Sequence, residues 1–142
     1  MRWRRLDFRV IGDERGMLLP IEGEDIVPFA IQRVYCIYDT MPNVRRGMHA
    51  HRHLQQVAIA LAGSCTFLLD DGFNREEIHL DALHNGIYMG SIVWREMYNF
   101  SEDCVLMVLA DQHYDNGDYI RDYHQFVAEA KAANGRGEVS GE

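Results

Sequence analysis

The segment 46–53 reads Arg-Gly-Met-His-Ala-His-Arg-His and places His49, His51 and His53 at every second position. An alternating run of apolar residues follows it, and the pattern predicts a β-strand region. Side chains two positions apart on a strand lie on the same face. His49 and His51 are therefore expected to present their imidazoles to one shared space, as metal ligands or as an acid–base pair. His53 is interpreted as an ordinary structural residue.

The residues around the histidines favour acid–base chemistry over a metal. Metal-binding β-barrels commonly follow a His-x-His pair with a glutamate and a distant histidine. Here Gln55 and Gln56 stand at the glutamate positions, and 85–112 contains no histidine. Carboxamides are weak ligands for divalent cations, although three imidazoles alone can hold zinc. Imidazoles have an unperturbed pKa of about 6.5 and can both take and give protons, so we expect no metal and no cofactor.

Two arginines are candidates for binding an anionic ligand. Arg33 and Tyr35 share one face of a predicted strand over 30–38. An arginine that points into a barrel is costly unless it is paired or bound to an anion. Arg46 supplies a second guanidinium near the histidines, and such a pair suits a diphosphate. Surface ion pairs with acidic residues are the alternative interpretation.

Other residues indicate a cavity beside the histidines. Within 56–62, one face carries large apolar residues and the other carries Gln56 and alanines. Small side chains opposite the histidines leave room for a ligand. Trp94 can stack on a sugar or a base, although core packing explains it equally well. Arg95 is expected to contact the ligand if its strand faces the cavity.

Composition limits the class of protein. The chain has 142 residues and a net charge of −8, which disfavours nucleic acid and anionic membranes as partners. It contains no apolar run long enough to span a membrane and no signal-peptide core at its N-terminus. Cys36, Cys65 and Cys104 are interpreted as buried free thiols in a reducing compartment. We expect a cytoplasmic protein.

Short alternating segments separated by turns predict an all-β fold. About ten strands are expected, including a hairpin with its turn at 12–16, and this spacing is typical of a sandwich or barrel. Only 118–133 has helical periodicity. We expect one domain over 1–134 and a flexible C-terminal tail over 135–142.

Taken together, the motifs resemble the nucleotide-sugar 3,4-ketoisomerases over about 8–126. The matching segments are Asp-Glu-Arg-Gly (13–16), Arg-Val-Tyr (33–35), Arg-Gly-Met-His-Ala-His (46–51), Leu-Ala-Gly-Ser-Cys (61–65), Val-Trp-Arg-Glu-Met (93–97) and Asp-Tyr-Ile-Arg-Asp-Tyr (118–123). The resemblance implies a cupin (RmlC-like jelly-roll) barrel with a short C-terminal helix, and a homodimer that exchanges N-terminal strands. It also implies that dTDP-4-keto-6-deoxyglucose becomes a dTDP-3-keto-6-deoxyhexose, which feeds 3-amino-sugar synthesis for surface polysaccharide or glycosylated natural products.

The resemblance also assigns roles. His49 and His51 match the family's histidine pair. The candidate substrate-binding residues are Arg15, Arg33, Tyr35, Arg46, Gln56, Trp94 and Arg95. Arg15 and Arg95 match positions that vary with the C4 epimer formed, and they point to opposite epimers, so the epimer stays open.

Moving a ketone from C4 to C3 requires removal of the C3 hydrogen, proton shifts between two oxygens, and reprotonation at C4. We assign one histidine, with a preference for His51, to removing and returning the carbon-bound proton. Its neighbour is assigned to the proton transfer between the two oxygens. No Gly-rich dinucleotide fingerprint is present, as expected for a reaction without a hydride acceptor. Two alternatives remain: a 4-keto-6-deoxyhexose epimerase, and a non-catalytic nucleotide-sugar-binding cupin.

Overall fold

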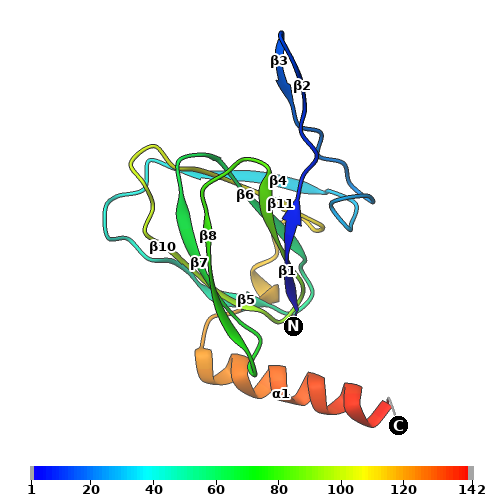
Figure 1. Cartoon of the computed structure of the whole chain (residues 1–142). Helices are drawn as coiled ribbons and strands as arrows, with labels where there is room; N and C mark the ends of the chain where they lie inside the picture. The colour runs from blue at the N-terminus through cyan, green and yellow to red at the C-terminus, as the bar shows by residue number, and fades with distance from the viewer. Residues whose placement is uncertain (1, 141–142) are drawn as a thin grey trace.

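Two antiparallel sheets face each other and enclose the core (Figure 1). The computed structural model describes the backbone of residues 2–140 and the side chains of residues 2–134. The first sheet contains, in spatial order, β1 (Trp3–Asp7), β9 (Asn85–Met89), β6 (Gln56–Ala62), β11 (Val105–Ala110) and β4 (Arg33–Tyr38). The second contains β12 (Tyr119–Ile120), β5 (Arg46–His51), β10 (Trp94–Tyr98), β7 (Cys65–Asp70) and β8 (Arg75–Leu80). The predicted all-β barrel is confirmed.

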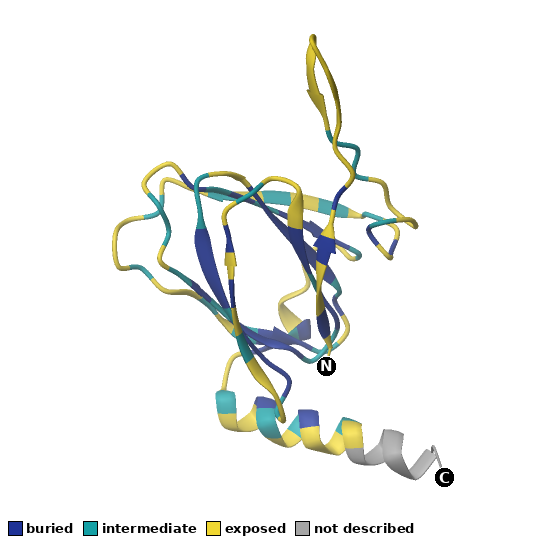
Figure 2. Ribbon diagram, in the orientation of Figure 1, coloured by how far each residue is buried: buried dark blue, intermediate teal, exposed yellow. Residues whose placement is uncertain are grey.

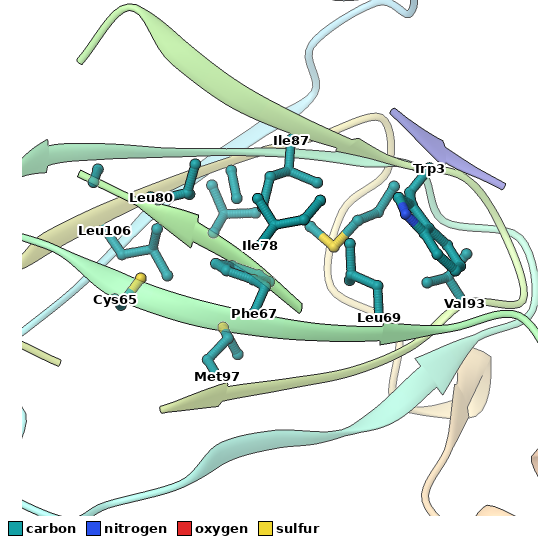
Figure 3. Packing of buried hydrophobic residues seen from close by; sticks show 14 of the residues in the cluster. Trp3, Cys65, Phe67, Leu69, Ile78, Leu80, Ile87, Val93, Met97 and Leu106 are labelled. Atoms are coloured by element: carbon teal, nitrogen blue, oxygen red, sulfur yellow. The ribbon is translucent and has the colours of Figure 1, made fainter. Parts of the chain in front are cut away.

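The main hydrophobic core lies between the sheets, mostly toward β7, β8 and β9. Phe67, Leu69, Ile78 and Ile87 project from these strands and are almost fully buried (Figures 2 and 3). Each position follows from strand alternation, because residues two apart turn the same face inward. Burying such side chains removes apolar surface from water and supplies the main stabilisation of the barrel.

A second cluster covers the outer face of the first sheet. Val57 and Ile59 point outward from β6 and pack with Leu6, Phe8 and Val27. Ala58 and Ala60 of β6 point inward instead, whereas Ala62, at the end of the strand, is exposed. The predicted division of this strand into a bulky face and a small face is therefore confirmed, and the small face is the one inside the barrel.

The C-terminal region begins differently from the prediction. Residues expected to be helical from 118 instead form a 3₁₀ turn, η1 (Asn116–Asp118), and β12, which pairs with β5. The helix α1 (Tyr123–Ser140) starts after Asp122, whose carboxylate accepts the N–H of Gln125 as an N-cap. The prediction was wrong here because backbone pairing with β5 overrides local helical periodicity. The helix continues past residue 134, where the domain was expected to end and the tail to begin. Residues 141–142 of that tail lie outside the described residues.

A hairpin projects away from the barrel, at the top of Figure 1. Its strands β2 (Ile11–Asp13) and β3 (Gly16–Leu18) pair with each other, and all six of their residues are exposed. The hairpin predicted from the turn signal at 12–16 is confirmed. Its apolar side chains Ile11, Met17 and Leu18 are exposed.

Strand β4 is at the edge of the first sheet and pairs only with β11 among the described strands. Arg33 and Tyr35 are half-buried on its inner face, whereas Val34 and Tyr38 are exposed on the outer face. Cys36 shares that outer face and is exposed, so its predicted burial was wrong. Cys65 and Cys104 are buried, as predicted. No helix in the described part of the chain is long and apolar enough to span a membrane.

Candidate active site

A β-bulge in β5 places the histidines inside the barrel. The register between β10 and β5 shifts so that Arg95 opposes His49 while Glu96 opposes Gly47. Met48 is the extra residue, and both Gly47 and Met48 have a positive φ. A Cβ on Gly47 would lie 2.9 Å from the carbonyl oxygen of Arg95, so only glycine permits this close approach. The bulge therefore depends on Gly47.

Three rings form a compact cluster beyond the bulge. The imidazoles of His49 and His51 lie 4.8 Å apart, edge to face. The Tyr119 ring lies 4.8 Å from His49 and 4.4 Å from His51. Tyr119 pairs directly with His51 across β12 and β5, which explains why it shares their face. The two imidazoles therefore lie on the same face, as predicted, and the Tyr119 ring packs against both of them.

His49 has a defined tautomer. Its Nδ1 lies 3.0 Å from the carbonyl oxygen of Gly47. A carbonyl only accepts, so Nδ1 carries the proton and Nε2 is left unprotonated. The side chain is half-buried, which leaves it open to a ligand. His49 is therefore arranged as a base.

His51 is arranged differently. It is only 2% exposed, and its Nδ1 lies 3.3 Å from the Asp118 carboxylate. The contact does not have hydrogen-bond geometry, and neither ring nitrogen has a hydrogen-bond partner among the described residues. Asp118 itself is fixed, because it accepts the backbone N–H groups of His53 and Leu54. His51 therefore lies at the buried end of the site.

Burial keeps both imidazoles neutral. Desolvation, with Arg95 as the next cause, lowers the pKa of His49 from 6.5 to about 4. The same causes, together with His49, lower the pKa of His51 to about 2. A buried cation next to an imidazole disfavours a second positive charge. Both rings are consequently free bases at neutral pH.

Arg95 is the charged centre of the barrel. It is 2% exposed, and its guanidinium donates twice to the Val93 carbonyl and once to the Gln56 side chain. Gln56 in turn donates to the Tyr35 hydroxyl at 3.1 Å. Desolvation lowers the pKa of Arg95 to about 10, so it stays cationic. No carboxylate forms a salt bridge with Arg95 within the described side chains.

Arg33 lies at the edge of the same interior. Its guanidinium stacks over Tyr35 at 4.6 Å and over Tyr114 at 5.4 Å. It forms no salt bridge to any carboxylate among residues 2–134. The predicted orientation of Arg33 and Tyr35 toward the barrel interior is confirmed.

Three other candidates lie elsewhere. Trp94 packs 5.7 Å from Phe126 under α1, because it and Arg95 are neighbours on β10 and must face opposite sides. Trp94 therefore packs in the core, which is the alternative that the sequence left open. Arg15 lies on the projecting hairpin and pairs with Asp13, away from the histidines. Arg46 is exposed near the start of the bulge, opposite Met97.

No group of three or more His, Cys, Asp or Glu side chains is arranged to hold a metal ion among the described residues. The glutamines predicted to be poor ligands are engaged elsewhere. Gln55 bonds to Asp111 and Tyr88. Gln56 connects Arg95 and Tyr35.

The family model described as FdtA, WxcM-like, C-terminal, matches residues 1–131. The chain belongs to this family. A relative from Aneurinibacillus thermoaerophilus, TDP-4-oxo-6-deoxy-alpha-D-glucose-3,4-oxoisomerase, is 50% identical over 121 residues, which cover 85% of this chain and 87% of the relative.

Solved structures of FdtA-like enzymes superpose closely. QdtA, a sugar 3,4-ketoisomerase from Thermoanaerobacterium thermosaccharolyticum in complex with TDP, is 42% identical with a TM-score of 0.89, covering 93% of this chain and 96% of that one. WlaRB, a TDP-quinovose 3,4-ketoisomerase from Campylobacter jejuni, is 48% identical with a TM-score of 0.86, covering 89% and 97%. The expected ketoisomerase-type cupin barrel is confirmed.

Sequence reasoning missed two residues of this FdtA-family site. The helix expected over 118–133 included both Asp118 and Tyr119. Both lie beside His51 because β12 pairs with β5. The available signal was the weak helical character of Asp118-Tyr-Ile, in which two β-formers follow a residue that favours turns.

Proposed function

We propose that this chain is a sugar 3,4-ketoisomerase that converts dTDP-4-keto-6-deoxyglucose into a dTDP-3-keto-6-deoxyhexose through an enediol. One observation carries the proposal. A neutral imidazole with a free Nε2, that of His49, lies on the strand directly opposite a buried cation, Arg95, that forms no salt bridge within residues 2–134. This combination of base and cation is what proton abstraction next to a ketone requires. Family membership supports the same reaction.

His49, rather than the preferred His51, is the base that acts on carbon. His51 is almost completely enclosed and faces Asp118, whereas His49 is half-buried with its Nε2 free. A base must reach within hydrogen-bond distance of the proton that it removes. The Nε2 of His49 takes the C3 proton, and the resulting imidazolium, which exchanges its proton with solvent, delivers a proton to C4. The His51 ring packs against the His49 ring and holds it in place.

Arg95 stabilises the negative charge that develops on the C4 oxygen when C3 loses its proton. Its guanidinium is already desolvated and oriented by Val93 and Gln56, so little reorganisation is needed during the reaction. The remaining N–H groups of a five-donor guanidinium are available to the sugar. The Gln56 side chain that accepts from Arg95 also donates a hydrogen bond to the Tyr35 hydroxyl.

We assign the nucleotide diphosphate to the rim of the barrel. Arg33 is held between two aromatic rings without a carboxylate partner in the described chain, and Arg46 is exposed opposite Met97 at the start of β5. Guanidinium groups bind diphosphates through paired hydrogen bonds. No nucleic acid or membrane partner is proposed for this acidic protein.

The active form is a homodimer with exchanged N-terminal hairpins. The hairpin exposes Ile11, Met17 and Leu18, while β4 exposes Val34 and Tyr38 beside an edge that lacks a strand. An open edge accepts a further strand, and apolar side chains on both elements favour their contact. Exchange would carry Arg15 toward the site of the partner copy.

The dimer is tested by light scattering of the wild type and of a Met17→Asp/Leu18→Asp variant. A wild-type dimer and a monomeric variant are expected. A wild type that stays monomeric at micromolar concentration contradicts the exchange.

The reaction belongs before an amino-transfer step, because a 3-keto sugar is the substrate from which a 3-amino sugar is made. We place the enzyme in the cytoplasm, as a single cupin domain. The experiment that tests the function is NMR of the product formed from dTDP-4-keto-6-deoxyglucose. A ketone at C3 is expected. A ketone retained at C4 with inverted neighbouring carbons would identify an epimerase, and unchanged substrate would identify a binding protein.

A further inference from the structure

We propose that a hollow at the β1 edge of the first sheet is a second anion site, which binds the diphosphate of a nucleotide outside the barrel. The hollow has a volume of about 360 Å³ and lies at the N-terminal end of β1, away from the projecting hairpin (Figure 1). This volume is within the range of small-molecule sites. The inference goes beyond the proposed function, which uses only the interior and the rim of the barrel.

Strand register brings two arginines to this hollow. Arg4 pairs with Tyr88 across β1 and β9, and the Arg2 carbonyl accepts the Gly90 N–H at 2.8 Å, one step beyond the end of β1. Trp3, which lies between the two arginines in sequence, points into the core. Residues two apart on a strand lie on the same face, so Arg2 and Arg4 both lie on the outer face of the sheet.

Neither guanidinium is neutralised by an acidic side chain. Arg2 donates to the Ser91 carbonyl at 3.3 Å, and the Arg4 guanidinium lies over the Tyr88 ring at 5.4 Å. No carboxylate among residues 2–134 forms a salt bridge with either arginine. A guanidinium has five N–H donors, so each arginine keeps donors for a ligand.

The hollow also lacks negative charge of its own. None of its lining residues, all of them within the described chain, has a carboxylate, although the chain has 22 acidic residues. Two carboxylates that contact wall residues are already engaged. Asp111 accepts two N–H groups of Gln55, and Glu76 accepts the indole N–H of Trp3 and the guanidinium of Arg5. The hollow is therefore a positively charged site on an acidic protein.

The walls of the hollow are fixed by contacts within the chain. The Tyr88 hydroxyl donates to Gln55 at 2.6 Å, and its ring packs partly against the outer apolar cluster. Gly90 contributes no side chain, and a Cβ there would lie 3.0 Å from the Arg2 carbonyl oxygen. The space that a larger residue would fill therefore stays open. A site whose walls are held before binding loses little conformational entropy when its ligand binds.

The proposed dimer leaves this hollow outside the exchange contact. Strands β1 and β4 are the two edges of the first sheet, with β9, β6 and β11 between them. The exchanged hairpin is assigned to the β4 edge, whereas the hollow is at the β1 edge. Two guanidinium groups on one face match an anion with two phosphoryl groups, because each group can bind through paired hydrogen bonds.

The test is equilibrium dialysis of radiolabelled TDP against the full-length protein, which counts the molecules bound per chain. The variant is Arg2→Gln/Arg4→Gln, and both arginines are exposed, so the fold should be kept. The matched control, Arg5→Gln/Arg9→Gln, removes the same charge from exposed arginines that do not line the hollow. Ketone migration and the unfolding temperature are measured for all three proteins.

We expect the wild type to bind two TDP molecules per chain, a tighter one in the barrel and a weaker one in the hollow. Arg2→Gln/Arg4→Gln should raise the Kd of the weaker site about 100-fold, or about 10-fold for each charge-assisted contact removed. The tighter site and kcat should stay as in the wild type. The control variant should still bind two TDP molecules.

Competition distinguishes the part of TDP that is recognised. Inorganic pyrophosphate should displace TDP from the weaker site, and thymidine should not, because the arginines bind phosphate oxygens. Displacement by thymidine alone would identify a site for the base and would overturn the proposal.

Three stoichiometries would also overturn the proposal. These are one TDP per chain in the wild type that Arg2→Gln/Arg4→Gln retains, two in both proteins, and loss of the second TDP in the control variant. Failure of the proposed function would look different, since the wild type would then form no 3-keto product, while the TDP lost with Arg2 and Arg4 would still be measured.

Discussion

The two halves of the barrel interior follow the same strand alternation but contain opposite chemistry. Toward β7, β8 and β9, the inward positions carry Phe67, Ile78 and Ile87, packed without polar groups (Figure 3). Toward β5, β10 and β12, they carry imidazoles, a phenol and the Arg95 guanidinium. The apolar half stabilises the fold, whereas the polar half contributes a cost that the apolar half must offset.

Burial of the polar half lowers the stability of the fold for two reasons. Arg95 is buried without a carboxylate partner among the described residues, and the ring nitrogens of His51 have no hydrogen-bond partner there. Buried polar groups without partners usually indicate function. A division follows that can be tested. Variants in the polar half should alter catalysis more than stability, and variants in the apolar half should do the reverse.

The largest effect is expected for His49→Asn. Loss of the carbon base should lower kcat about 1,000-fold, within the usual range for a general base. TDP affinity and the unfolding temperature should change little. His53→Asn is the matched control, because His53 engages the site only through its backbone N–H. Near wild-type turnover by His49→Asn, measured by NMR of the product, would remove the proposed base.

Phe67→Ala tests the other half. Phe67 is 1% exposed, and its truncation should lower the free energy of unfolding by about 3–5 kcal/mol. Urea unfolding measures this loss. At a temperature where the variant is folded, kcat should remain close to wild type. A loss of kcat as large as that of His49→Asn would show that the two halves are not separable.

The two halves also differ in how many of their inward-facing residues the sequence predicts. Strand alternation was sufficient for the core and for the inward positions of His49, Tyr35 and Arg95. The same alternation should have excluded Trp94, since neighbours on a strand cannot both face the barrel.

Tyr119 could not be predicted with confidence, because its place depends on pairing with β5, a contact about 70 residues away in sequence that local periodicity does not encode. The proposed approach of Arg15 to the site depends on the proposed second copy of the chain. Likewise, the pKa values of the histidines depend on burial and on Arg95, which only the folded structure reveals.

A smaller effect is expected from pH. The folded-state pKa values of His49 and His51, about 4 and about 2, lie below the unfolded value near 6.5. Below pH 6.5 the unfolded chain therefore binds protons that the folded protein does not. The free energy of unfolding should fall as pH decreases from 6.5 to 5, approaching about 1.4 kcal/mol per pH unit for each histidine.

This pH dependence can be assigned with variants. Urea titrations at several pH values measure it, and His49→Asn/His51→Asn should flatten the curve between pH 6.5 and 5. An equal slope in the double variant would show that other groups cause the pH dependence.

The smallest expected effect is that of chelation. Because the proposed proton transfers use only side chains, prolonged treatment with EDTA should leave kcat unchanged. Activity that disappears with EDTA and returns with zinc would instead support metal binding by the histidines.

The most direct test of the central claim is a single turnover of dTDP-4-keto-6-deoxyglucose by the wild-type enzyme in D₂O, with NMR of the product. An exchangeable imidazole proton on His49 predicts a ketone at C3 and deuterium at C4. A 3-keto product that carries none of the solvent deuterium at C4 would contradict solvent-exchanging acid–base catalysis, and a ketone that remains at C4 would contradict the isomerisation itself.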